Sequence, residues 1–215
     1  MLLIVPRVAV TGQPEATWTE AIERVKSTVV FLGPEDAKGN PLPKATGCIL
    51  TVRGVFHVLT AKHVVVEMKD GKFTDKRIDQ DLLAYFNRAD GTLGKRRLAD
   101  IKSKLDVAWV FHEREDVDLA ILPFAMNLEA DDLRAIPEDL FIHAGALREL
   151  DEVFFLSYQP QIKLTDKVRP IYRGGTVSLL LPDKTLYIDG SAFPGNSGSG
   201  KFQDRCRIDC SREIL

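Results

Sequence analysis

The stretch PGNSGSGKF (residues 194–202) has two incompatible interpretations, and each requires a different fold. From Gly195 to Lys201 it nearly matches G-x-x-x-x-G-K followed by Ser or Thr, the loop that cradles phosphates. From Gly195 to Gly198 it forms a tight turn that presents the hydroxyl of Ser197. A phosphate loop belongs to a parallel α/β sheet, so the residues around this stretch decide the fold.

The flanking residues argue against a phosphate loop. Such a loop follows a buried strand and opens a helix whose N-terminus binds the phosphates. Residues 189–194 are turn-like, and Phe202 occupies the position where a hydroxyl would coordinate magnesium. Only 13 residues follow Phe202, too few for the rest of such a sheet. We therefore predict no metal or nucleotide cofactor, and nucleotide hydrolysis remains only as a hypothesis to be tested with ATP and magnesium.

Composition narrows the classes of partner. The chain has 215 residues, 29 basic and 31 acidic, for a formal net charge of −2. Nucleic-acid binders usually carry a basic face, and the short run Lys95-Arg96-Arg97 is better interpreted as a solvated loop or strand end. We predict neither a nucleic-acid nor a membrane partner.

Three cysteines are too few for a disulfide scaffold. Cys206 and Cys210 lack a nearby Cys or His pair that would complete a zinc site, so we predict incidental thiols and no metal. The apolar start of the chain is interrupted at Pro6 and has no basic segment before it. It is too short for a signal sequence or a membrane span, and we expect a cytoplasmic protein.

Short β-prone runs separated by Gly, Pro and Asn dominate the chain after an early helix. Residues 14–26 predict that helix, since Pro14 suits a first turn and Trp18, Ile22 and Val25 share one face. Strands are predicted at residues 28–32, 47–52, 55–60, 82–86, 107–111, 119–122, 153–158, 175–181 and 185–188. No long helices alternate with them, which favours an all-β fold of antiparallel sheets.

Four segments are predicted. Residues 1–26 form an N-terminal extension with a helix, and residues 27–125 form a first β unit. Residues 126–150, acidic at first and containing Pro137, form a linker with some helix. Residues 151–215 form a second β unit.

A serine nucleophile needs a base, usually histidine, and that imidazole needs an acid that fixes its tautomer. The sequence LTAKHVV (residues 59–65) places His63 where a β run meets a turn. The sequence DLAIL (residues 118–122) places Asp118 at the start of an apolar run. Asp116 competes with Asp118 because both leave the same face of a strand, but the apolar run begins directly after Asp118.

The three motifs LTAKHVV, DLAIL and GNSGSG, in the order His, Asp, Ser inside an all-β chain, resemble the trypsin-like (chymotrypsin-fold) serine peptidases. The resemblance covers roughly residues 27–199 and is greatest to bacterial members without disulfides. It implies two antiparallel β-barrels, which residues 27–125 and 151–215 would form. It also implies a serine endopeptidase that acts on peptide or protein substrates.

The resemblance also implies a role for each site residue. His63 would be the general base and then acid, Asp118 would orient it, and Ser197 would be the nucleophile. The backbone of Gly195, Asn196 and Ser197 would form the oxyanion hole, with the amides of Gly195 and Ser197 as donors. Ser191 could line the substrate pocket. The remaining histidines, His57, His112 and His143, are predicted to be surface or structural residues.

After Ser197 the chain departs from the family pattern. Family members continue into further strands, whereas residues 200–215 are highly charged and lack strand alternation. The second barrel is therefore expected to be incomplete. A truncated or frame-altered sequence, completion by a partner chain and a degenerate fold all remain open. The alternative to an endopeptidase is an interaction module of the same fold with little or no proteolytic activity.

Overall fold

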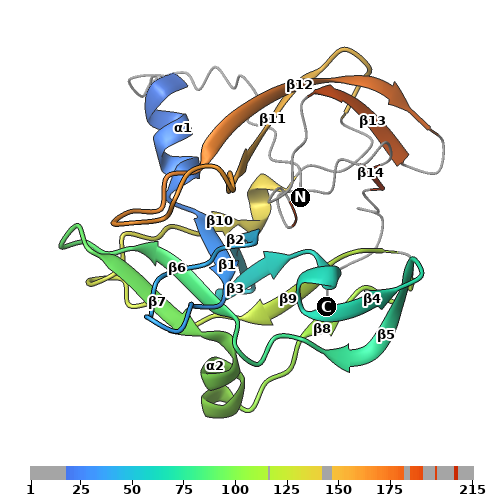
Figure 1. Cartoon of the computed structure of the whole chain (residues 1–215). Coiled ribbons are helices and arrows are strands. Elements are labelled where there is room, and N and C mark those ends of the chain that lie inside the picture. The colour runs from blue at the N-terminus through green and yellow to red at the C-terminus, as the bar shows by residue number, and fades with distance from the viewer. Residues whose placement is uncertain are drawn as a thin grey trace.

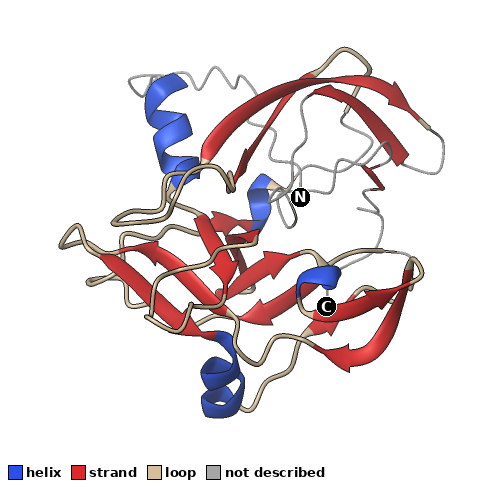
Figure 2. Cartoon of the chain, viewed as in Figure 1, coloured by secondary structure: helices blue, strands red, loops and turns tan. Residues whose placement is uncertain are grey.

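The computed structural model describes residues 18–115, 117–141, 147–181, 185–190, 197 and 206–207. Strands dominate the described part, with few helices (Figure 2). The helices are α1 (Trp18–Lys26) and α2 (Leu98–Leu105), with single 3-10 turns at η1 (Lys62–Val64) and η2 (Glu138–Leu140). The strands are β1 (Val29–Gly33), β2 (Ala45–Val52), β3 (Val55–Thr60), β4 (Val66–Lys69), β5 (Lys72–Arg77), β6 (Leu83–Asn87), β7 (Leu93–Arg97), β8 (Val110–Phe111), β9 (Ala120–Pro123), β10 (Ile136–Pro137), β11 (Glu152–Ser157), β12 (Ile171–Leu180), β13 (Thr185–Gly190) and β14 (Cys206–Arg207).

The larger sheet runs in the order β7-β6-β1-β2-β3-β9-β8, with β10 paired to β2 beside this path. All pairings along the path are antiparallel, and only β10 joins in parallel. The predicted all-β class with little helix is therefore confirmed. The sheets are not closed into the two barrels that were expected. In the larger sheet, no pairing among the described residues joins β7 to the two-residue strand β8.

Two tight hairpins connect strands of the first part of the chain. Arg53 and Gly54 connect β2 to β3, and both have positive φ, at 50° and 77°. Asp70 and Gly71 connect β4 to β5 in the same way, at 50° and 76°. Paired positive φ values define the two-residue turn whose twist matches antiparallel strands. Neither β4 nor β5 was predicted from the sequence.

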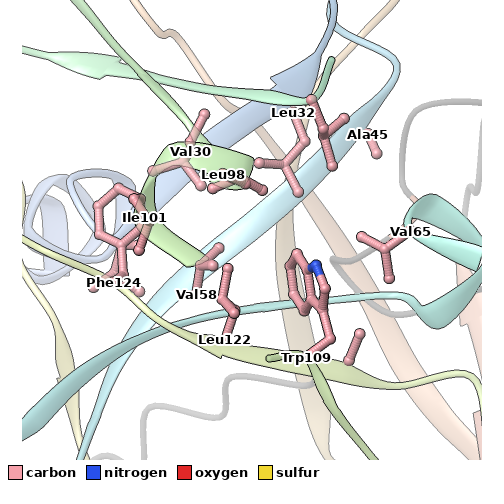
Figure 3. Close-up of a cluster of buried hydrophobic side chains, with 14 of the residues drawn as sticks. Val30, Leu32, Ala45, Val58, Val65, Leu98, Ile101, Trp109, Leu122 and Phe124 are labelled. Carbon is pink, nitrogen blue, oxygen red and sulfur yellow. The ribbon is translucent and has the colours of Figure 1, made fainter. Parts of the chain in front are cut away.

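The main core lies against one face of the larger sheet and is covered by α2 (Figure 1). Figure 3 shows the ring of Trp109 among Val58, Val65 and Leu122, which belong to this core. The buried carboxylate of Asp79 accepts hydrogen bonds from Trp109 Nε1 at 2.8 Å and from Lys102 Nζ of α2 at 2.7 Å. These contacts hold α2 and the segment before β8 against the sheet.

The smaller sheet runs in the order β11-β12-β13-β14. It packs on the other side of the larger sheet from α2, with α1 at its edge (Figure 1). The interface is an apolar cluster drawn from β1 and β6 on one side and from the end of β11 and the loop after it on the other. Its buried members are Val29, Phe31, Leu83, Tyr85, Leu156, Tyr158, Leu164 and Val168. The two sheets therefore share one continuous interior.

The described part of helix α1 begins at Trp18. Residues 14–17 of the predicted helix lie outside the described residues. The helix ends at Lys26, and just after it the Thr28 hydroxyl donates to the carbonyl of Val25 at 2.7 Å. No helix among the described residues is both long and apolar enough to cross a membrane.

The segment predicted as a linker returns to the larger sheet before it leaves for the smaller one. Ile136 of β10 is buried and pairs with Leu50 of β2. Asp131 is buried as well and accepts a hydrogen bond from Arg96 Nη2 at 2.6 Å. The guanidinium of Arg96 lies over the ring of Phe86, 4.4 Å from its centre. The run Lys95-Arg96-Arg97 forms the end of β7, as one of the two expectations had it, with Lys95 and Arg97 exposed and Arg96 half-buried.

Candidate active site

Antiparallel pairing brings the two strands that carry His63 and Asp118 to one edge of the larger sheet. Strand β3 ends at Thr60, which lies opposite Ala120 at the start of β9. His63 follows the end of β3 and Asp118 precedes the start of β9, so the register alone places them together although 55 residues separate them.

The turn η1 fixes the position of His63. Its backbone closes with hydrogen bonds from Val64 N to Ala61 O at 3.1 Å and from Val65 N to Lys62 O at 3.0 Å. Ala61 and Val65 on either side are buried in the sheet interior. This apolar anchoring holds the histidine between them at the sheet edge, with 21% of its side chain exposed.

Both carboxylate oxygens of Asp118 contact His63. Oδ1 accepts a hydrogen bond from the backbone N of His63 at 2.9 Å, and Oδ2 lies 2.6 Å from the ring atom Nδ1. An ionised carboxylate only accepts, so Nδ1 carries the proton of a neutral ring and leaves Nε2 as an acceptor. Two contacts from one carboxylate therefore restrain His63.

Ser197 completes a chain of three side chains. Its Oγ lies 2.8 Å from Nε2 of His63, where the hydroxyl can donate to the imidazole. Its carbonyl accepts a hydrogen bond from the backbone N of Thr46 at 2.8 Å. A hydroxyl, an imidazole and a carboxylate in this order can transfer the hydroxyl proton to the ring and stabilise the resulting imidazolium.

Several residues singled out in the sequence lie outside the described residues. These are the oxyanion-hole residues Gly195 and Asn196, the pocket residue Ser191, the competing acid Asp116, and also His143 and Cys210. Asp118, which was preferred to Asp116 on its sequence context, contacts His63. Among the described residues, no group of three or more His, Cys, Asp or Glu side chains could hold a metal ion.

The other two described histidines make different hydrogen bonds. His57 is in β3, and its Nδ1 lies 2.8 Å from the carbonyl of Val55. His112 follows β8, and its Nδ1 accepts a hydrogen bond from the backbone N of Arg114 at 3.1 Å. Both bond to local backbone.

Two threonines that support the site were not identified from the sequence. Thr46 and Thr60 are almost fully buried, and the Thr60 hydroxyl donates to the Thr46 carbonyl at 2.8 Å. The pair lies at the same sheet edge as His63 and Asp118. Threonine in a β-prone run is ordinary, so no local signal marks these two positions.

Comparison with known proteins identifies the family of this chain. The family model of the trypsin-like peptidase domain matches residues 45–208, so the chain belongs to this family of serine peptidases. The match begins at β2 and includes His63, Asp118 and Ser197.

One similar solved structure is the serine endoprotease from Yersinia pestis, with 19% sequence identity and a TM-score of 0.42. The likeness covers 87% of this chain and 54% of that protein, so this chain spans about half its length. No curated protein sequence matches the chain closely enough to count as a relative.

Proposed function

We propose that this chain is a serine endopeptidase that hydrolyses peptide bonds through an acyl-enzyme, with Ser197, His63 and Asp118 as its catalytic residues. The observation that carries the proposal is the continuous set of contacts from Asp118 Oδ2 to His63 Nδ1 at 2.6 Å and from His63 Nε2 to Ser197 Oγ at 2.8 Å. Membership of the trypsin-like peptidase family supports it.

In the first step Ser197 Oγ attacks the carbonyl carbon of the substrate peptide bond, and its proton passes to Nε2 of His63. The imidazolium that forms carries its charge beside the Asp118 carboxylate, which stabilises it without taking the proton. The C–N bond then breaks, and Nε2 gives its proton to the departing amine. The acyl group stays on Ser197 as an ester.

In the second step water takes the place of the amine. His63 Nε2 accepts a proton from the water as its oxygen attacks the ester carbon. The bond from that carbon to Oγ breaks, and Nε2 returns the proton to Ser197. Backbone amides of Gly195 and Ser197, with Asn196 between them, are proposed to stabilise the oxyanion in both steps.

The fold supplies the orientation that this mechanism needs. Asp118 bonds to both the backbone and the ring of His63, so the imidazole loses little further freedom as the reaction begins. The side chains of His63 and Asp118 are 21% and 19% exposed, so substrate can reach the ring while most of the pair is shielded from water.

A fluorophosphonate probe tests the proposal, because its tetrahedral phosphoryl centre mimics the acyl-transfer intermediate and captures an activated serine. We expect the chain to label at Ser197 and Ser197→Ala to abolish labelling. His63→Ala should slow labelling by several orders of magnitude, because members of such a triad act as a unit. Asp118→Asn should slow it by about 10⁴, the loss that serine proteases show when the corresponding change leaves the imidazole in the wrong tautomer.

His57→Ala is the matched control, since His57 lies in β3 of the same sheet and its ring bonds to the nearby Val55 carbonyl. It should label at the wild-type rate. A folded wild-type protein that neither labels nor cleaves a peptide library would contradict the proposal and favour the interaction module. A saturable rise in melting temperature with ATP and magnesium would instead support nucleotide binding.

A further inference from the structure

Thr46 is bonded to several parts of the candidate site. Its backbone N donates to the carbonyl of Ser197 at 2.8 Å, and its own carbonyl accepts from the Thr60 hydroxyl at 2.8 Å. Its side-chain Oγ1 accepts from the backbone N of Tyr158 at 2.9 Å. We propose that Thr46 is a positioning residue, which sets the distance between Ser197 and His63 by joining the nucleophile, the histidine strand and the second sheet. This inference rests on the proposed function.

The backbone of Thr46 is available for this role because of strand register. Successive residues of a strand point their N–H and C=O groups to opposite neighbours, so Thr46 points the same way as Cys48. The β2–β3 ladder pairs Cys48 with Leu59 and does not include Thr46. After Thr60 the chain turns away into η1, so β3 does not continue opposite Thr46. The backbone N of Thr46 donates to the carbonyl of Ser197 instead, and the carbonyl of Thr46 accepts from the Thr60 hydroxyl.

The side chain of Thr46 faces the second sheet. Thr46 lies opposite Phe31 in the β1–β2 pair, and the ring of Phe31 meets the ring of Tyr158 edge-on, with 5.1 Å between their centres. Tyr158 directly follows β11 of the second sheet. The Thr46 hydroxyl therefore bonds across the interface between the sheets, at a position where only 1% of the residue is exposed and its branched side chain has little rotational freedom.

This arrangement links the His63–Ser197 contact to Thr46. His63 is three positions beyond Thr60, and Ser197 is bonded to Thr46 through its own carbonyl. If the Thr46 hydroxyl is lost, the Tyr158 N–H remains buried without its acceptor, and the second sheet must shift to find another. That shift moves Ser197 relative to His63, because the second sheet loses a buried hydrogen bond to β2 and keeps only its apolar contacts and the bond from Thr46 N to the Ser197 carbonyl.

Three variants separate positioning from general stability. Thr46→Val removes the acceptor and keeps the shape, whereas Thr46→Ser keeps the oxygen. Thr28→Val is the matched control, because the Thr28 hydroxyl is also buried near this sheet and donates to the Val25 carbonyl, away from Ser197. Each folded variant, checked by circular dichroism and thermal melting, is labelled with the fluorophosphonate probe across a range of pH.

We expect Thr46→Val to label about 10- to 100-fold more slowly than wild type, the scale of loss that a remote displacement of about 1 Å causes. Thr46→Ser should restore labelling to within a few-fold of wild type. The pH of half-maximal labelling should not change, because the His63–Asp118 pair is untouched. Thr28→Val should melt at a lower temperature and yet label at the wild-type rate.

Equal labelling rates in Thr46→Val and wild type would overturn the inference, and so would an equal slowing in Thr28→Val. If wild type itself fails to label, the proposed function fails, and crystal structures of wild type and Thr46→Val then decide the positioning role. A His63 Nε2 to Ser197 Oγ distance that stays at 2.8 Å in both would refute it, and a longer distance in Thr46→Val would support it.

Discussion

The two sheets that form the candidate site differ in how deeply their strands are buried. In the larger sheet every residue of β1 is buried, and so are the first six residues of β2. In the smaller sheet β11 is buried along most of its length, but β12 buries only Val177 among its ten residues. The apolar residues Tyr172 and Leu179 of β12 are both 41% exposed.

This difference indicates which half of the site limits its assembly. His63 and Asp118 belong to the larger sheet, whereas Ser197 follows the last long strand of the smaller one. Segments with few buried apolar contacts open at a lower free energy than core strands do. We therefore expect the nucleophile to leave its position more often than the His63–Asp118 pair breaks.

The largest effect should come from the ion pair that joins α2 to the buried Asp79 in the loop before β6. Lys102→Met removes the ammonium that contacts Asp79 at 2.7 Å and leaves a fully buried carboxylate. Losing one partner of a buried pair costs about 3 to 5 kcal/mol, so chemical denaturation should show a loss of that size. Lys104→Met, at an exposed position of the same helix, should have an effect within about 0.5 kcal/mol. Equal losses would mean that the contact of Lys102 with Asp79 adds no stability of its own.

Leucine truncation compares the two sheets directly. Leu122→Ala in β9 removes a fully buried side chain and should reduce the free energy of unfolding by about 2 to 5 kcal/mol. Leu179→Ala in β12 removes a side chain that is 41% exposed, and its loss should be under about 1 kcal/mol. A similar loss in both variants would show that β12 is as important to the core as β9 is.

Titration of Cys48 tests whether water is excluded from the buried face of the larger sheet. Burial raises the pKa of the Cys48 thiol to about 12, from an ordinary value of 9.0. The folded state keeps the proton that the unfolded chain loses, so this contribution is complete below pH 9 and is lost as pH rises towards 12. Between those limits stability should fall by about 1.4 kcal/mol per pH unit from this group.

Cys48→Ser supplies the comparison, because a serine hydroxyl does not ionise in this range. Denaturation of wild type and of this variant between about pH 9 and pH 11 should give a shallower slope for the variant. Parallel slopes would contradict the burial of the thiol.

The smallest effect concerns two adjacent glycines in β12. A Cβ added at Gly174 would meet nothing within 4 Å, so Gly174→Ala should stabilise the strand by about 0.5 kcal/mol through lower chain entropy. A Cβ at Gly175 would lie 2.7 Å from Ile188 Cγ2 and 3.0 Å from the Asp189 carbonyl oxygen, so Gly175→Ala should be destabilising. Thermal melting distinguishes the two, and a lower melting temperature for Gly174→Ala would contradict the open position of that residue.

Local patterns were sufficient to predict the buried strands. The bounds of β3 agree with the expected residues 55–60, and β9 is displaced from the expected run by one residue. These runs are apolar and end at turn residues, so each is recognisable by itself. His63, Asp118 and Ser197 could be proposed from the sequence because each lies in a short motif, and the first two motifs adjoin such strands.

The sequence analysis missed elements that are rich in charged residues or that form only between segments far apart in the chain. The hairpin of β4 and β5 carries many charged residues, yet Asp70-Gly71 is a strong two-residue turn signal that was overlooked. Helix α2 is only eight residues long. The pairing of β10 with β2 and the bonds of Thr46 arise only when distant segments meet, so no local window could predict them.

The parallel pairing of β10 with β2 also bears on the order in which the parts of the site are synthesised. Residues 136 and 137 are the last that the larger sheet requires, and Ser197 follows 60 residues after Pro137. During synthesis at about 5–20 residues per second, that gap corresponds to about 3 to 12 s. Closing a sheet takes far less time than this for most small domains, whose folding rates are about 1 to 10⁵ per second. We therefore expect that His63 and Asp118 can meet in the nascent chain before Ser197 has been made.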